Sequence, residues 1–278
     1  LKTLLGAEGQ MLVSDPPVHG KTSTIGGLIA TGVSGSRRPY AGAIRDAVLG
    51  VSLLLQDATQ AEFGGQVMKN VAGYDVSRLV CGSFGMLGPI LDVSLKVAPK
   101  PEMEASVSLE CSPMRAKEII EKLTRRVSGI SASCYLEGQL RLRFSGSETA
   151  VTKEISGQGG ESIGNGFWAE LDNQTLASLV ATKDLWRLST DPSEPFSEER
   201  FPIADWGFGQ RWLLDPEVNP RDSYGGVGHW TRVRRSEAAF SAETFQPLSP
   251  LQMRLMRRVK SAFDSEGLFN PGCMYPGL

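Results

Sequence analysis

Three glycines recur at every third position in the segment Gly82-Ser83-Phe84-Gly85-Met86-Leu87-Gly88. This segment follows a predicted short helix over 75–80 and precedes a predicted strand over 90–97. A dinucleotide-binding Rossmann loop has the opposite order, strand before helix, and a different glycine spacing. Because glycine has no Cβ, the segment indicates backbone that passes close to a ligand. The alternative is a structural turn.

A second glycine cluster begins at Thr24-Ile25-Gly26-Gly27 and continues to Gly32. We expect residues 14–35 to form a loop whose backbone N–H groups can bind phosphate, the alternative being a flexible loop without a ligand. The preceding Gly20-Lys21-Thr22 does not make a P-loop, because Asp15 stands where that motif needs its first glycine. Two such clusters favour a cofactor site of a non-Rossmann kind.

The composition is that of an ordinary globular protein. The chain has 278 residues, of which 41% are hydrophobic and 22% charged, and its net charge of -2 excludes a chain-wide basic field for nucleic acid. Four scattered cysteines and two histidines argue against a zinc or iron–sulfur site, so no metal site is predicted. We expect neither a membrane span nor a signal peptide. The first residues resemble the end of an amphipathic helix, so we expect a further segment before Leu1.

The junction between two predicted domains, 1–100 and 101–278, is marked by Pro99 and Pro101. Strands and helices alternate beyond it, which is typical of the α+β class. The last helix carries a basic face of Arg254, Arg257, Arg258 and Lys260, which we expect to be solvated, with a docking surface as the alternative. The predicted strands are 48–55, 61–63, 90–97, 105–109, 134–136, 140–144, 183–189, 204–213 and 230–233; the predicted helices are 1–10, 75–80, 113–128, 173–180 and 250–266.

Four charged residues are candidates for the chemistry. Arg45 next to Asp46 lies between the glycine clusters, where an arginine can hold a phosphate or carboxylate; the alternative is a solvated pair. In the second half, His229 is a candidate base and Arg211 a candidate substrate contact. Structural roles are the alternatives for both.

The segments 24–27, 42–51 and 82–90 together resemble the FAD-binding domain of the vanillyl-alcohol oxidase and p-cresol methylhydroxylase (PCMH-type) superfamily. More narrowly, residues 64–79 and 268–276 resemble the E-subunit family of bacterial glycolate oxidases, also called glycolate dehydrogenases. The resemblance implies an α+β flavin domain whose first subdomain would precede Leu1. A cap domain on an antiparallel sheet would follow, with FAD as the cofactor.

The resemblance also assigns cofactor contacts. The pyrophosphate and ribitol of FAD would lie along residues 24–34, the adenosine half along 82–90, and the tail 268–276 would return near the flavin ring. The residues implied in binding are Thr24, Gly26, Gly27, Gly32, Ser34, Arg45, Asp46, Gly82, Ser83, Gly85, Gly88, Ile90, Asn270 and Pro271.

The function implied is that of an FAD-binding subunit in a complex that oxidises glycolate, a 2-hydroxy acid, to glyoxylate and passes the electrons to a partner subunit. The implied partners are a homologous catalytic FAD subunit and an iron–sulfur subunit. The implied location is the cytoplasm, at the inner face of the plasma membrane through the complex. Two other hypotheses stay open: a scaffold subunit that has lost its flavin, and a free-standing FAD-dependent alcohol oxidase.

Overall fold

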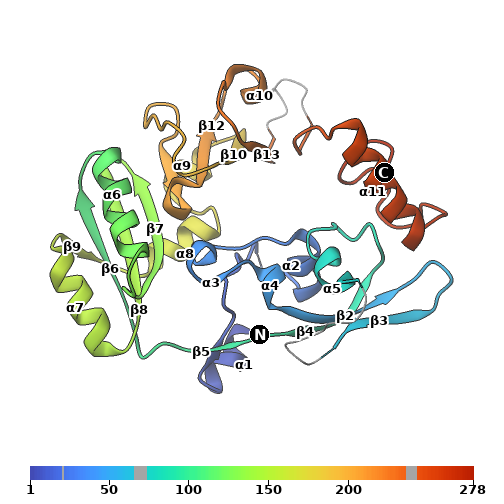
Figure 1. Cartoon of the computed structure of the whole chain (residues 1–278), viewed down its shortest axis with the longest axis horizontal. Helices are drawn as coiled ribbons and strands as arrows, with labels where there is room; N and C mark the ends of the chain where they lie inside the picture. The colour runs from blue at the N-terminus through green and yellow to red at the C-terminus, as the bar shows by residue number, and fades with distance from the viewer. Residues whose placement is uncertain (21, 66–73, 236–242) are drawn as a thin grey trace. The chain divides into compact units, whose positions relative to one another are not determined.

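The computed structural model describes residues 1–20, 22–65, 74–235 and 243–278 (Figure 1). The chain forms two compact units. The first comprises residues 1–38, 42–99 and 247–278, and the second comprises 39–41 and 100–246. The second unit therefore differs from the expected domain 101–278, because the last helix and the tail pack into the first unit. Part of the glycolate oxidase-like segment, residues 66–73, lies outside the described residues.

A three-stranded antiparallel sheet with the order β3-β2-β4 forms the centre of the first unit. Its middle strand, β2, is the apolar run Val48–Leu54, which buries both faces. Ile29, Ile44 and Leu53 are fully buried in one core with it, and Val259 and Phe263 from the last helix pack against that core. The elements of this unit are α1 (Lys2–Ala7), β1 (Gln10–Met11), α2 (Ile25–Thr31), α4 (Ile44–Ala47), β2, β3 (Gln60–Gly64), α5 (Val76–Val80), β4 (Ile90–Leu95), β5 (Ala98–Pro99) and α11 (Pro250–Phe263), while α3 (Arg38–Ala41) spans the boundary between the units.

The expectation that residues 14–35 form a loop is wrong for the stretch Ile25–Thr31, which is the helix α2. Thr24 caps the helix, because its Oγ1 accepts a hydrogen bond from the N–H of Gly27 at 3.0 Å. Gly32, with φ +64°, ends it. Two glycines inside a helix each cost about 1 kcal/mol relative to alanine. Complete burial of Ile29 in the core offsets that cost.

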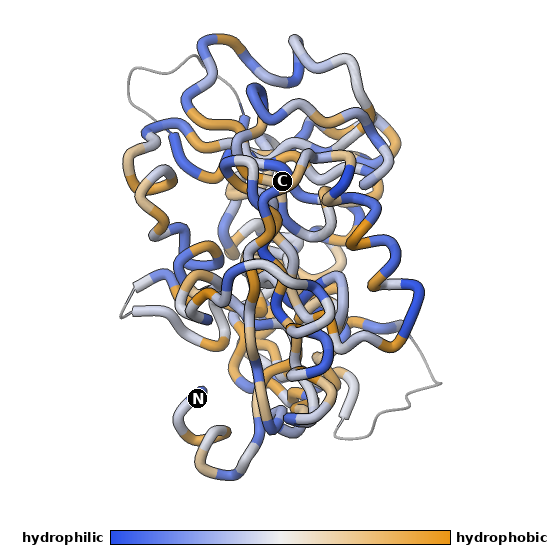
Figure 2. The backbone as a smooth tube through the Cα atoms, turned by 90° about the vertical axis from the view of Figure 1, so that its left-hand side faces the viewer, coloured by the Kyte–Doolittle hydropathy of each residue, from blue (hydrophilic) through white to orange (hydrophobic). Residues whose placement is uncertain are grey.

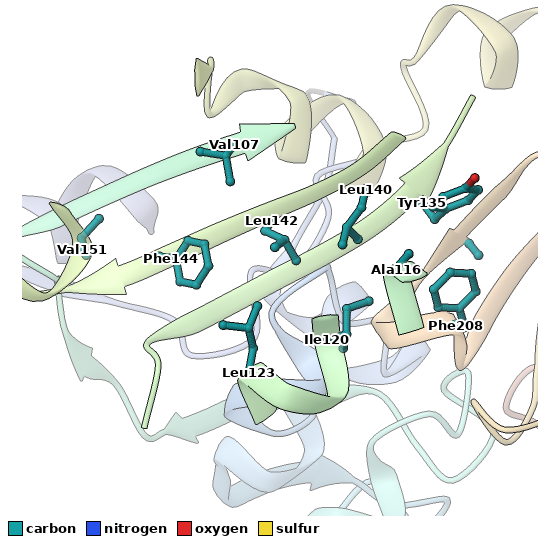
Figure 3. Packing of buried hydrophobic residues seen from close by; sticks show 11 residues of the cluster. Val107, Ala116, Ile120, Leu123, Tyr135, Leu140, Leu142, Phe144, Val151 and Phe208 are labelled. Carbon is teal, nitrogen blue, oxygen red and sulfur yellow. The ribbon is translucent and has the colours of Figure 1, made fainter. Parts of the chain in front are cut away.

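An eight-stranded antiparallel sheet organises the second unit, in the order β13-β10-β12-β11-β7-β8-β6-β9. Successive side chains along each strand point to opposite faces of the sheet. Both faces are covered by buried hydrophobic residues. Figure 3 shows one of them, where Ile120 and Leu123 of α6 pack on Leu142 and Phe144. The elements are β6 (Met103–Glu110), α6 (Pro113–Thr124), β7 (Ile130–Leu136), β8 (Gln139–Gly146), α7 (Glu148–Gln158), β9 (Glu161–Ile163), α8 (Gly166–Asp172), α9 (Ala177–Ala181), β10 (Leu185–Ser189), β11 (Ile203–Asp205), β12 (Gln210–Leu214), α10 (Pro220–Ser223) and β13 (His229–Arg234).

The predicted strand 204–213 is wrong, because the chain reverses in its middle. β11 and β12 pair as a hairpin, and the corner between them is the turn Trp206–Phe208. All three corner residues have positive φ, +52°, +64° and +73°. Aromatic residues rarely adopt this conformation. Burial of Phe208 and a 3.0 Å hydrogen bond from the N–H of Gly207 to Ser133 Oγ hold the corner in place.

The predicted helix 173–180 is also displaced. Residues 173–176 lie between the shorter helices α8 and α9, and residues 177–180 lie in α9. The two helices place Trp168 and Leu179 in the core on the second sheet face. The capped helix α7 was not predicted, because its hydrophobic residues are few and only Val151 is buried. None of the described helices is long and apolar enough to cross a membrane. Figure 2 accordingly shows hydrophilic and hydrophobic residues interspersed along the trace.

Asp205 is the last residue of β11 and is 2% exposed. Burial raises its pKa to about 8, although a hydrogen bond from Gln210 Nε2 at 2.9 Å opposes the shift. A raised pKa means that the folded state binds the proton of this carboxyl group more tightly than the unfolded state does. The resulting stabilisation is complete only at pH values below the pKa of the group in the unfolded chain. That stabilisation is lost progressively as the pH rises towards 8.

We therefore expect the free energy of unfolding to fall between pH 5 and 8, by at most about 1.4 kcal/mol per pH unit from this group. Asp205→Asn, which mimics the neutral form, removes that decline. Urea unfolding at several pH values measures it. Asp191→Asn is the control, since a hydrogen bond from Ser193 lowers the pKa of this exposed carboxyl group. Parallel pH profiles for wild type and Asp205→Asn would contradict the assignment.

Candidate functional site

The glycine loop, residues 81–88, lies against the end of α2. The N–H groups of Gly82 and Phe84 donate hydrogen bonds to the carbonyls of Ile29 and Ala30, at 3.0 and 2.8 Å. A Cβ on Gly32 would lie 3.1 Å from the Gly82 Cα. The loop and the helix end therefore meet backbone to backbone, which only glycine permits.

The three spaced glycines have positive φ but different surroundings. A Cβ on Gly88 would lie 2.6 Å from the Leu54 carbonyl oxygen, so this glycine is needed for packing against the sheet. A Cβ on Gly82 would meet no atom within 4 Å, so its side faces open space. Gly88 therefore has the structural role, whereas ligand contact at Gly82 stays a prediction.

Gly85 meets Asn270, which comes from the C-terminal tail. Asn270 Nδ2 donates a 2.7 Å hydrogen bond to the carbonyl of Phe84, and a Cβ on Gly85 would lie 2.8 Å from the same nitrogen. Asn270 itself has φ +44°. The fold thus brings together two predicted cofactor residues that are far apart in the sequence. Its neighbour Pro271 belongs to the same exposed turn of the tail.

Three more predicted cofactor residues lie in or beside α4, namely Ser34, Arg45 and Asp46. Ser34 Oγ accepts a hydrogen bond from the N–H of Ile44 at 3.0 Å, and Asp46 Oδ2 accepts one from the N–H of Ala43 at 3.0 Å. Burial raises the pKa of Cys81 to about 11; Arg45 opposes this shift and Asp46 adds to it. Both charges therefore act electrostatically on the residue that precedes Gly82.

A cavity of about 630 Å³ extends along α2, from Thr24 before its start to Thr31 and Val33 at its end. Thr24 and Gly27 line it, but the N–H of Gly27 is already bonded to Thr24. Gly26 faces the sheet instead, where a Cβ would lie 4.0 Å from the Ile90 carbonyl. The cavity is lined by Leu1, Lys2, Thr3, Leu12, Pro16, Pro17, Val18, His19, Thr22, Ser23, Thr24, Ile25, Gly27, Leu28, Thr31 and Val33.

Among the described residues of this unit, two buried hydroxyl groups lack a hydrogen-bond partner, Ser83 Oγ in the glycine loop and Ser14 Oγ. An unsatisfied buried hydroxyl costs about 1–3 kcal/mol, which a polar ligand can recover. The carbonyl of Ser14 accepts a bond from Gly35, so Ser14 lies beside the turn that follows α2. The seven residues of α2 span only about 10 Å, so the cavity along the helix and the glycine loop at its end lie close together. This arrangement fits an elongated dinucleotide such as FAD.

The catalytic candidates both lie in the second unit. Arg211 is fully buried and donates hydrogen bonds to the carbonyls of Phe208, Pro195 and Glu194, at 3.1, 2.5 and 2.7 Å. Arg211 therefore fixes a loop, and this geometry argues against substrate contact. His229 is exposed at the start of β13, and partial burial with the charges of Arg187 and Arg221 lowers its pKa. Its role as a base stays a prediction.

Lys260 and Asp264 are the contacts that sequence reasoning missed. Lys260 was expected on a solvated face, but it is 7% exposed and its Nζ donates to the carbonyls of Met86 and Phe269. The available signal was its position, one residue after the inward-facing Val259 and four before Asp264. Within the described ranges, no group of three His, Cys, Asp or Glu residues is placed to hold a metal ion.

Comparisons with known proteins identify the family. The model of an FAD binding domain family matches residues 1–64. Glycolate oxidase subunit GlcE of Escherichia coli (strain K12) is 36% identical over 283 residues, which cover 100% of this chain and 79% of that protein. D-lactate dehydrogenase of Archaeoglobus fulgidus is 26% identical over 338 residues, 98% of this chain and 74% of the relative.

Two further matches are partial. Glycolate oxidase subunit GlcD of Bacillus subtilis (strain 168) is 36% identical over 117 residues, 42% of this chain and 24% of that protein. A solved structure of alkyldihydroxyacetonephosphate synthase has a TM-score of 0.62 at 13% identity and supports the fold alone. The match covers 97% of this chain and 62% of the synthase.

The predicted resemblance, the α+β fold class and the FAD cofactor are thereby confirmed. The full-length similarity to GlcE carries this assignment, and the FAD binding domain match supports it. The chain belongs to the glycolate oxidase subunit family of FAD-dependent oxidoreductases that act on 2-hydroxy acids, within the PCMH-type FAD superfamily.

Proposed function

We propose that this chain is the FAD-binding subunit of a complex that oxidises glycolate to glyoxylate. The observation that carries the proposal is the 36% identity to GlcE over the whole chain. The partial similarity to GlcD supports a homologous flavin subunit as one partner. We further propose an iron–sulfur subunit as the electron acceptor, and a cytoplasmic location at the inner face of the plasma membrane.

When bound, FAD would accept a hydride from the α-carbon of the hydroxy acid. The residues of this chain would bind and orient the cofactor. The open side of Gly82 would allow the cofactor to approach the backbone closely, and Ser83 offers an unpaired hydroxyl group. Asn270 holds the glycine loop through its hydrogen bond to the carbonyl of Phe84. Arg45 and Asp46 place a charge of each sign next to this loop.

The surroundings of the two catalytic candidates, Arg211 and His229, bear on whether this chain can turn over substrate alone. Since Arg211 is committed to backbone carbonyls, it is a poor clamp for a substrate carboxylate. His229 is the remaining predicted base, and partial burial with the charges of Arg187 and Arg221 lowers its pKa, which makes it a weaker proton acceptor. We therefore propose that turnover needs the partner subunits.

Replacing Gly85 by alanine tests the cofactor site. The new Cβ would displace the Asn270 side chain, so we expect FAD binding to weaken by about tenfold or more, or ~1.4 kcal/mol. FAD titration followed by flavin fluorescence measures the affinity. Gly138→Ala is the matched control, because Gly138 has the same φ, +72°, with nothing within 4 Å of its Cβ position. Equal losses in both variants would mean that only backbone strain is seen.

The substrate and partner assignments are tested on the co-expressed complex. We expect glycolate to bleach the visible flavin absorbance of the complex, while the chain alone shows no turnover. D-lactate is the comparison substrate, and its preferential oxidation would reject glycolate. A complex that assembles without flavin on this chain would identify a scaffold subunit. Turnover by the isolated chain with oxygen would identify a free-standing oxidase.

A further inference from the structure

We infer that Lys260 is a positioning residue of the flavin site. It joins the glycine loop to the C-terminal tail, residues 264–272, and thereby holds Asn270 in place. The inference concerns FAD binding alone, so it stands or falls independently of glycolate as the substrate.

All three hydrogens of the Lys260 ammonium group are used. Nζ donates to the carbonyl of Met86 at 2.8 Å, to the carbonyl of Phe269 at 2.6 Å and to Asp264 Oδ2 at 2.5 Å. The first carbonyl belongs to the glycine loop and the second to the tail. One buried side chain of α11 therefore binds both segments at once.

Asp264 completes the arrangement from the other side. Its side chain is fully buried, and besides Lys260 it accepts hydrogen bonds from the N–H groups of Leu268 and Phe269, at 2.9 and 2.8 Å. A buried charge persists only when it is paired and its hydrogen-bonding capacity is filled. The tail is consequently fixed in the one path that places these N–H groups around the carboxylate.

The two carbonyls that Lys260 binds flank the contact of Asn270 with the glycine loop. Met86 follows Gly85, and Phe269 precedes Asn270, so the Lys260 link lies directly beside the Asn270–Phe84 hydrogen bond. Asn270 is exposed and has a positive φ, a backbone state that needs support from its neighbours. Lys260 supplies this support through its bonds to both neighbouring segments.

Arg257 gives a natural comparison on the same helix. Its Nε donates a 3.2 Å hydrogen bond to the carbonyl of Gly277, so it ties α11 to a residue beyond the tail. It is exposed and contacts neither the glycine loop nor residues 264–272 in this hydrogen bond. The effect of losing a cationic contact of α11 can therefore be separated from the effect of losing the link to the glycine loop.

The test is a double-mutant cycle on FAD affinity. We expect Lys260→Met and Asn270→Ala each to weaken FAD binding by about tenfold, and the double variant to be little weaker than either alone, because both act through one contact. Arg257→Met should stay within about twofold of wild type. Additive losses, or wild-type affinity in Lys260→Met, would overturn the inference.

Hydrogen exchange on the wild-type chain is the second measurement, since removing one partner of a buried ion pair can prevent folding. We expect added FAD to slow amide exchange in residues 82–88 and 264–272 together. Protection of the glycine loop with unchanged exchange in the tail would overturn the coupling, whatever the behaviour of the variants.

Discussion

Direct contact between two stretches of backbone, at Gly32 and Gly82, is the constraint on which the first unit depends. Because no side chain separates them, the end of α2 and the glycine loop lie as close as main chains can. The N–H groups of the loop then reach the last carbonyls of the helix. This contact leaves the open side of Gly82 and the hydroxyl group of Ser83 beside the tail residue Asn270. The proposed cofactor site is thus a product of backbone packing more than of reactive side chains.

The second unit is built on a different principle. Its sheet buries apolar residues on both faces, and long polar side chains are taken up by fixed partners, as Arg211 is by three carbonyls. The corner Trp206–Phe208 is strained but fixed by the buried Phe208 ring and by Ser133. Of the two predicted site residues in this unit, Arg211 is committed to backbone carbonyls and His229 is exposed.

The sequence predicted those parts of the fold in which local signals and tertiary packing agree. The apolar run Val48–Leu54 is a buried strand, and Ser249 with Pro250 begins the last helix as expected. The helix α2 differs from the prediction because Gly26 and Gly27 lower its helix propensity, while burial of Ile29 in the core stabilises it. The corner at Trp206 escaped because its backbone conformation is unusual for an aromatic residue. In the site, glycine spacing pointed to the loop, whereas the role of Lys260 depends on carbonyls from distant segments, which no spacing reveals.

The half-buried thiol of Cys81 has a consequence for a flavin site. Oxidants such as peroxide attack the thiolate of a cysteine rather than the thiol. With a pKa of about 11, raised by burial, Cys81 carries almost no thiolate at neutral pH. The exposed Cys273 in the tail has no such burial. Oxidation should therefore begin at the exposed Cys273 and spare Cys81, the first residue of the glycine loop.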